Sequence, residues 1–272
     1  MKSIKLDTAF RYLFLFALSL FFFLPLLAMA RFAFQTTPVF NLNLNNLLDN
    51  WSLDALRYVL ADDQAWQTTQ LSLFLSIFTI LVTFLILLPL ATYVEIFAPK
   101  MKPYLTGITL LPWLVPPVAL VVGVAATFRP VAPWFLSSPY SLVPFYVLWT
   151  LPFSYRAIDS GLRLMGAKTQ YEAAVLMGAR WTTFFLKIIV PNLRTAMIVT
   201  AVLSFALVMG EFAFASLLLK QTLPTYLVVI QGGQPRAGFV LALLLMISSA
   251  ILLGFLVYVL RRRGIKLNAT GI

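Results

Sequence analysis

The stretch LSLFLSIFTILVTFLILLPLATYV, residues 71–94, contains no charged side chain. A helix needs about 20 apolar residues to cross the hydrocarbon core of a bilayer, so this stretch is long enough. A helix is the only form expected, because an unpaired backbone amide in hydrocarbon costs several kcal/mol and the stretch lacks the strict alternation of a barrel strand. The stretch therefore predicts a transmembrane helix.

Five other runs are similarly apolar and long. With the first, they are residues 12–30, 71–94, 104–128, 130–155, 195–219 and 237–260. The fourth run includes an outer turn, RPVAPWFLSSPYS, so its helix is expected to start near Ser141. The chain is 61% hydrophobic with a mean hydropathy of +0.92, more apolar surface than a soluble domain hides. We expect an all-α integral membrane protein with six transmembrane helices, forming a single domain over residues 1–272.

The distribution of Lys and Arg among the loops predicts the orientation, because cytoplasmic loops carry the basic excess. With the N-terminus inside, fifteen of the 20 basic residues are cytoplasmic and five are not. The inner set is Lys2, Lys5, Arg11, Lys100, Lys102, Arg156, Arg163, Lys168, Arg180, Lys187, Arg194, Arg261, Arg262, Arg263 and Lys266, and the outer set is Arg31, Arg57, Arg129, Lys220 and Arg236. Both termini are therefore expected inside. The net charge of +11 is then explained by topology, and no nucleic-acid partner is expected.

The N-terminus has an alternative interpretation. LAMA, residues 27–30, resembles a signal-peptidase site after a basic start and an apolar core. The apolar run is longer than the usual 7 to 15 residues of a signal peptide, and cleavage would strand one basic end outside. We therefore expect an uncleaved first helix.

Cysteine and histidine are absent from the sequence. Their absence excludes disulfides, thiol nucleophiles, cysteine or histidine zinc sites and histidine acid–base chemistry. The apolar runs also contain no cluster of paired carboxylates or metal ligands. We expect no catalytic residue and no metal site, so the chain is not expected to be an enzyme.

Charge, glycine and helical spacing gather in YEAAVLMGARWTTFFLKIIVPNL, residues 171–193, within the longest inner loop, residues 156–194. Glu172 suits the start of a short helix, where the helix dipole stabilises a carboxylate. Gly178 costs about 1 kcal/mol inside a helix, so we expect a bend or a close backbone approach there. A second short helix should follow the break.

The second short helix has an apolar face. Trp181, Phe184, Phe185 and Ile188 recur at helical spacing until Pro191 ends the element. From the residues alone, the loop could equally be an interfacial amphipathic helix lying under the membrane.

The loop resembles the cytoplasmic EAA loop of ABC importer permeases, the membrane subunits of binding-protein-dependent transport systems. The matching pattern is Glu172-Ala173-Ala174, three residues, Gly178, nine residues, Ile188, one residue, then Val190-Pro191. Val190 is a departure, since the family usually has Leu there. The resemblance extends over residues 64–263, the permease core.

The resemblance implies a type I importer permease of the bacterial cytoplasmic (inner) membrane, crossing it several times. Its implied partners are two copies of a cytoplasmic ATPase, a second permease subunit, an extracytoplasmic substrate-binding protein and membrane lipid. ATP and Mg would be bound by the ATPase, with no cofactor in this chain. The loop would be a coupling helix that docks on the ATPase through Glu172, Ala173, Ala174 and Gly178, with Ile188 and Pro191 completing the motif. Arg180 and Lys187 would pair with acidic ATPase residues, or simply obey the positive-inside rule.

The stretch GLRLMGAKT, residues 161–169, is close to a phosphate-binding loop. Such a loop needs Gly directly before Lys, after a strand, and here Ala167 separates Gly166 from Lys168. We therefore expect ATP hydrolysis on a separate polypeptide.

Two features suggest a substrate path. Glu211 is the only acidic residue well inside an apolar run, where a charge usually faces a cavity or a partner; it could instead be protonated or paired with the partner permease. Pro112, Pro116 and Pro117 interrupt the third run, and a broken helix exposes backbone groups that can line a path, although simple kinking is the alternative. Gly107, Gly123 and Gly254 are expected at close-packed positions.

Within the family, the fifth run and the following LPTYLVVIQ resemble permeases of the polyamine (spermidine/putrescine) type, which carry an acidic residue near the place of Glu211. Gly210 departs from that type, which often has a second acid there. Ferric iron, thiamine, aminoethylphosphonate and an oxyanion remain open as substrates. Residues 35–69 are expected to meet the binding protein or to cap the membrane interface. An ion-driven secondary transporter is the competing class, but no inverted repeat is evident.

Overall fold

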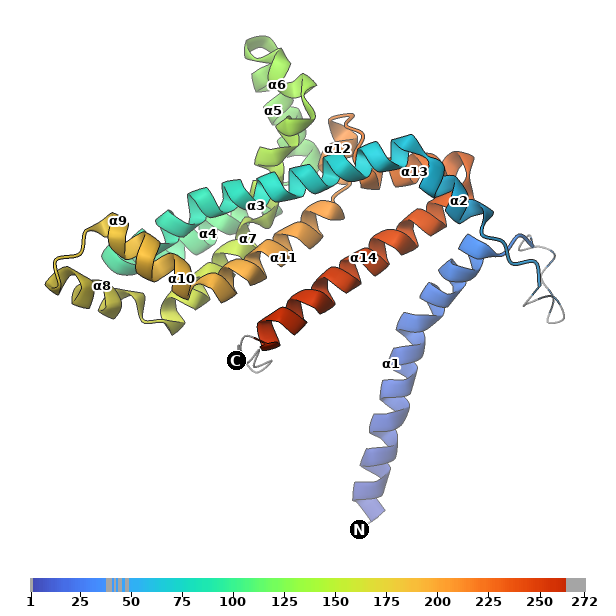
Figure 1. The fold of residues 1–272 in the computed structure, drawn as a ribbon, viewed down its shortest axis with the longest axis horizontal. Coiled ribbons are helices and arrows are strands. Elements are labelled where there is room, and N and C mark those ends of the chain that lie inside the picture. The colour runs from blue at the N-terminus through green and yellow to red at the C-terminus, as the bar shows by residue number, and fades with distance from the viewer. Residues whose placement is uncertain (1, 38–40, 42, 44–45, 47–48, 263–272) are drawn as a thin grey trace. The chain divides into compact units, whose positions relative to one another are not determined.

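The computed structural model describes residues 2–37, 41, 43, 46 and 49–262, and most of these residues are helical (Figure 1). The helices are α1 (Lys2–Phe34), α2 (Asp54–Ala61), α3 (Asp63–Phe97), α4 (Lys102–Leu114), α5 (Pro117–Val131), α6 (Pro133–Ser137), α7 (Leu142–Leu164), α8 (Ala167–Leu176), α9 (Trp181–Phe184), α10 (Val190–Asn192), α11 (Arg194–Met209), α12 (Ala213–Leu217), α13 (Leu223–Gly233) and α14 (Pro235–Arg262). Short 3-10 turns η3 (Pro99–Met101) and η4 (Pro139–Ser141) and a π-helical turn η5 (Phe185–Ile189) complete them. The predicted all-α class is confirmed. Arg263 and Lys266 lie outside the described residues.

The apolar runs coincide with these helices, but two of the runs are broken. Within the described residues, the helix Phe10–Phe34 and the helix Asp63–Phe97 are each long and apolar enough to cross a membrane. The third run is divided into α4 and α5, which are bent by 92° at the break. The fifth run is divided into α11 and α12. The fourth helix begins at Leu142, as predicted from the outer turn. The count of six spans stays a prediction.

The described residues fall into two compact units. One unit contains residues 1–66 and 227–250. In it Phe32 of α1 stacks on Phe239 of α14, with ring centroids 5.5 Å apart. The turn between α13 and α14 is tight, since a Cβ on Gly238 would lie 2.1 Å from Cγ of Gln231. Glycine is required there.

The other unit contains residues 67–226 and 251–272. Its helices α4, α7 and α11 pack side by side, with α8 to α10 at one end of the bundle and α5, α6 and α12 toward the other (Figure 1). One buried cluster, around Ile158 and Leu162, lies at the end near α8 to α10. A second, around Tyr146 and Phe214, lies near α12. Each end therefore has a core of its own.

Glycine packing differs from the expectation. A Cβ on Gly107, Gly123 or Gly254 would meet no atom within 4 Å among the residues that the structure describes, so the close packing expected at these glycines is wrong for that part of the chain. The close contact is instead at Gly161, where a Cβ would lie 2.7 Å from Cβ of Ala196 and 2.8 Å from Cδ2 of Leu193. The presence of glycine in an apolar run does not by itself identify the helix face that meets a neighbour.

Candidate functional site

The loop between α7 and α11 begins with a left-handed glycine. Gly166 has φ +63° and precedes α8, and its amide donates to the carbonyl of Arg163 at 3.0 Å. Residues with a Cβ pay about 1–2 kcal/mol for this conformation, which explains glycine here. The turn ends α7 and sends α8 off in a new direction. The stretch 161–169 is therefore the end of one helix and the start of another.

The break predicted at Gly178 is confirmed. Gly178 has φ +78°; its amide donates to the carbonyl of Val175 at 2.9 Å, and the amide of Ala179 donates to the carbonyl of Ala174 at 3.0 Å. These two bonds form a Schellman motif, the common way to satisfy the last carbonyls of a helix. The loop is thus a helix, a glycine turn and a second helix.

The second helix buries the predicted face. Phe184 is fully buried, and Trp181, Phe185 and Ile188 pack partly buried against the same core cluster. Ile189 is also fully buried, one residue beyond the predicted spacing, because Phe185–Ile189 forms a π-helical turn. The helix ends at Asn192, directly after Pro191, and is bent by 68° from α11.

An aromatic cluster, Phe97, Tyr171, Trp181 and Phe184, joins this loop to the end of α3. The ring of Tyr171 on α8 lies 5.1 Å from Phe97 of α3 and 5.1 Å from Phe184 of α9, measured between centroids. Trp181 lies 5.5 Å from Phe97 and 5.8 Å from Tyr171. Such aromatic pairs are each worth about 0.5–1.5 kcal/mol beyond area burial. Both short helices are therefore fastened to a long helix of the bundle.

The outward face of the loop contains most of the expected docking residues. Glu172, Ala173, Gly178 and Arg180 are exposed, whereas Ala174 is 1% exposed and packs into the core. The sequence analysis did not identify two further exposed residues next to this face. Leu176 and Met177, directly before the glycine turn, are 89% and 80% exposed. Grouped exposed apolar side chains are typical of surfaces that meet another protein or a membrane, and Val175-Leu176-Met177 before Gly178 is the sequence signal for such a group.

A charged cluster lies beside the loop and was also missed, because its members were counted only as loop charges. Lys102 at the start of α4 pairs with Glu95 of α3 and lies 3.9 Å from Asp159 of α7. Asp159 also pairs with Arg163, one turn further along α7. The hydrogen bond and the negative charge of Asp159 raise the pKa of Arg163. The cluster links the ends of three helices.

Glu211 lies at the break between α11 and α12. Its carboxylate accepts hydrogen bonds from the amides of Phe214, at 2.8 Å, and Ala215, at 3.4 Å, and the residue is 6% exposed. Both amides belong to the first turn of α12, whose free N–H groups need acceptors. Glu211 thus caps α12.

The prolines lie at the other break. Pro112 is inside α4, while Pro116 precedes α5 and Pro117 is its first residue. The two breaks are connected. Trp113 of α4 stacks on Trp149 of α7 with centroids 4.3 Å apart and donates to its carbonyl at 2.9 Å.

Trp149 in turn meets Phe214, the residue whose amide binds Glu211, with ring centroids 5.9 Å apart. Helix α12 also packs on α5. The Glu211 segment and the proline segment are far apart in the sequence, and the structure brings them together.

The described residues combine broken apolar helices with a two-helix loop packed on the bundle, and comparisons with known proteins show the class of protein to which this architecture belongs. Residues 100–266 match the family model of binding-protein-dependent transport system inner membrane components. The chain belongs to this family.

Two relatives support the assignment. An ABC transporter permease protein, ORF1, of Streptomyces antibioticus is 30% identical over 167 residues, which cover 60% of this chain and 72% of that protein. The molybdenum transport system permease protein ModB of Azotobacter vinelandii is 28% identical over 135 residues, which cover 46% of this chain and 59% of that protein.

Proposed function

We propose that this chain is the permease subunit of an ATP-driven importer in a bacterial cytoplasmic membrane, and that α8 to α10 receive the force from a separate ATPase. Two copies of the ATPase, a second permease chain and a binding protein would complete the transporter. One observation carries the proposal: α8 and the glycine turn after it present Glu172, Ala173 and Gly178 outward, while the opposite side of α8 is fixed to the bundle through Tyr171 and Ala174.

The packing of this loop on the bundle allows it to transmit movement to the long helices. Movement of a docked partner against α8 would be passed to α3 through the aromatic cluster and to α7 through the core around Ile158. Close-packed interiors transmit displacement because they have few voids to absorb it. The exposed Leu176 and Met177 add apolar area to the proposed docking face.

A pair of glycine variants tests the docking. Gly178→Asp and Gly166→Asp have the same backbone cost, about 1–2 kcal/mol, and both side chains would enter open space. We expect Gly178→Asp to abolish ATPase association and uptake while Gly166→Asp keeps association, measured by co-purification from membranes. Glu172→Lys should behave like Gly178→Asp, and Asp54→Lys on α2 is its charge control. Normal association of both loop variants would remove the coupling role.

For the solute, we propose a small oxyanion as the first candidate and a polyamine as the second. The oxyanion is favoured by the molybdenum permease among the relatives. The polyamine is favoured by the resemblance of the fifth apolar run to polyamine-type permeases. That preference depends on a Glu211 carboxylate that is available to bind a cation. In this structure both oxygens of Glu211 accept backbone amides.

Uptake measurements separate the candidates. Membrane vesicles with the complete transporter, ATP and binding protein should accumulate labelled molybdate or sulfate, and excess unlabelled oxyanion should compete. If the vesicles instead accumulate labelled spermidine, and oxyanions do not compete, the polyamine becomes the first candidate and the oxyanion the second. Accumulation of either solute without ATP would favour a secondary transporter and contradict the proposed class.

A further inference from the structure

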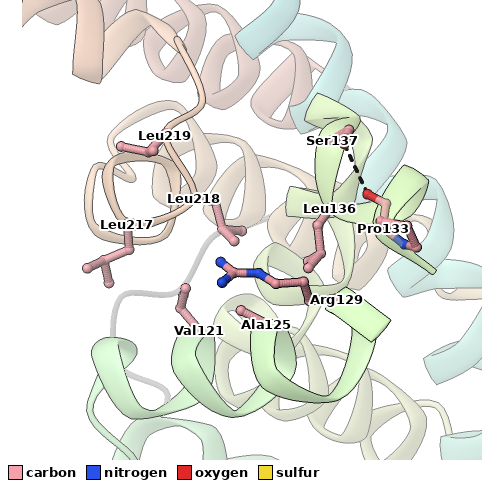
Figure 2. A pocket seen from close by; sticks show the side chains of 9 residues that line it. All are labelled: Val121, Ala125, Arg129, Pro133, Leu136, Ser137, Leu217, Leu218 and Leu219. Carbon is pink, nitrogen blue, oxygen red and sulfur yellow. Dashed lines mark hydrogen bonds between the residues drawn. The ribbon is translucent and has the colours of Figure 1, made fainter. Parts of the chain in front are cut away.

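A cavity of about 280 Å³ lies where α5, α6 and the segment after α12 meet (Figure 2). Its volume is well above the roughly 30 Å³ that one water occupies in the liquid. Most of the wall is aliphatic, with Val121 and Ala125 on α5 and Leu218 opposite them. The guanidinium of Arg129 extends into the space between Val121 and Leu218 (Figure 2). The Arg129 side chain is exposed, and one side of it lies against a largely aliphatic wall.

The guanidinium of Arg129 has no hydrogen bond or ion pair with any residue that the structure describes. None of the residues lining the cavity is acidic. Glu211, before α12, has its carboxylate bound to backbone amides. Arginine has five N–H donors in a planar fork that fits carboxylate, phosphate and similar groups bidentately. The donors in this cavity are thus free for a ligand.

A second cation stands at the edge of the cavity. Nζ of Lys220 donates to the carbonyl of Ser137, a lining residue, at 2.7 Å. Burial lowers the pKa of the Lys220 ammonium, so an anion nearby would relieve an unfavourable environment.

The turn that places Lys220 is strained. Leu219 has φ +55°, and the amide of Lys220 donates to the carbonyl of Ala215 at 2.8 Å, so a leucine occupies the position that usually holds glycine in a Schellman motif. Strain of about 1–3 kcal/mol in a non-glycine residue persists only where surrounding contacts hold it. The Lys220 contact with Ser137 is such a restraint, and it holds the ammonium of Lys220 against a residue that lines the cavity.

We propose that this cavity is an anion-binding site in which Arg129, supported by Lys220, holds a tetrahedral oxyanion. The ligand chemistry is a phosphate-like group carrying at least one negative charge. Two sources supply it: a free inorganic oxyanion, or the headgroup phosphate of an anionic lipid at the membrane surface. The site needs no ATPase and no transport to be occupied, so it stands or falls independently of the proposed importer function.

The test uses the full chain in nanodiscs. In phosphatidylcholine discs, equilibrium dialysis measures binding of labelled sulfate, molybdate and phosphate in turn. In discs containing phosphatidylglycerol, native mass spectrometry measures retained anionic lipid. Arg129→Gln should weaken the retained ligand at least about tenfold, because charge-assisted bonds to a guanidinium are lost. Arg57→Gln, at an exposed arginine of α2, is the matched control and should change nothing.

Two further variants protect the test against misfolding. Ala125→Asp places a carboxylate one helical turn before Arg129, where it should pair with the guanidinium and expel the anion while the arginine remains. Arg129→Lys keeps the charge but loses the fork, so it should bind more weakly than wild type and more strongly than Arg129→Gln.

The outcomes are distinct. Loss of sulfate, molybdate or phosphate binding in Arg129→Gln and Ala125→Asp supports a free oxyanion as the ligand. Loss of phosphatidylglycerol alone supports the lipid headgroup. Equal binding of every anion and lipid by wild type, Arg129→Gln and Ala125→Asp would overturn the proposal.

Discussion

At Gly161, α7 and α11 approach so closely that only hydrogen fits between them. A methyl group would lie 2.7 Å from Cβ of Ala196. We expect Gly161→Ala to force the helices apart and to destabilise the protein by about 1–3 kcal/mol, the usual cost of overpacking. Thermal unfolding of the purified protein in detergent measures this. Gly123→Ala is the control: it is also within a helix but meets open space, so it should be neutral or stabilising by up to about 1 kcal/mol.

Glu211 allows a second test with single residues. If the carboxylate mainly caps α12, Glu211→Ala should lower stability by about 0.5–2 kcal/mol, while Glu211→Gln, which keeps one acceptor oxygen, should lose less. Unfolding midpoints and uptake kinetics are measured on the same preparations. We expect uptake of an oxyanion by Glu211→Gln to keep the wild-type KM. A large rise in KM with unchanged stability would instead assign Glu211 to the substrate path.

Among the helices, the charged cluster at the ends of α3, α4 and α7 is the clearest link outside the core. Asp159→Asn removes the carboxylate shared by Lys102 and Arg163. We expect a loss of about 1 kcal/mol, since the groups are partly exposed and screened. A double-mutant cycle with Lys102→Met should show coupling that decreases in 1 M salt, because the Debye length shrinks to about 3 Å. Strict additivity at low salt would contradict the link.

The sequence predicted helices better than it predicted their faces and breaks. Apolar runs locate the helices because lipid leaves the backbone no alternative, and Gly178 marked its turn because left-handed backbone favours glycine. The inward position of Ala174 could not be read, since alanine suits either face of a helix. The capping role of Glu211 could not be read either, because it depends on a break in α11–α12 that no proline marks.

For the molecule as a whole, the crossing pattern is the main untested expectation. Reporter fusions at Gly178 and after Arg262 should both show cytoplasmic activity, and a fusion at Ser137, in the predicted outer turn, should show the opposite. Alkaline phosphatase and a fluorescent protein provide the two complementary signals. Cytoplasmic signal at Ser137, with full-length insertion verified, would contradict the six-span arrangement.

For the candidate site too, some contacts could be predicted from the sequence and others could not. Contacts local in sequence, such as the helix, glycine turn and helix of the inner loop, follow from the order of the residues. Contacts between distant segments do not, and neither the Trp113 to Phe214 aromatic chain nor the approach of Lys220 to Ser137 has a sequence signal. Those contacts connect the breaks and form the Arg129 cavity, so the proposed anion site could be found only from the structure.

The π-helical turn Phe185–Ile189 holds one residue more than an α-helical turn would. Deleting a single residue there, such as Leu186, whose side chain is exposed, would leave an ordinary α-turn with both flanks still facing the same way. The same deletion in the middle of α11 would rotate every later side chain by about 100° and turn its buried stripe outward. The loop between α7 and α11 thus contains a spare position, where loss of one residue leaves the two flanks of the turn facing as before.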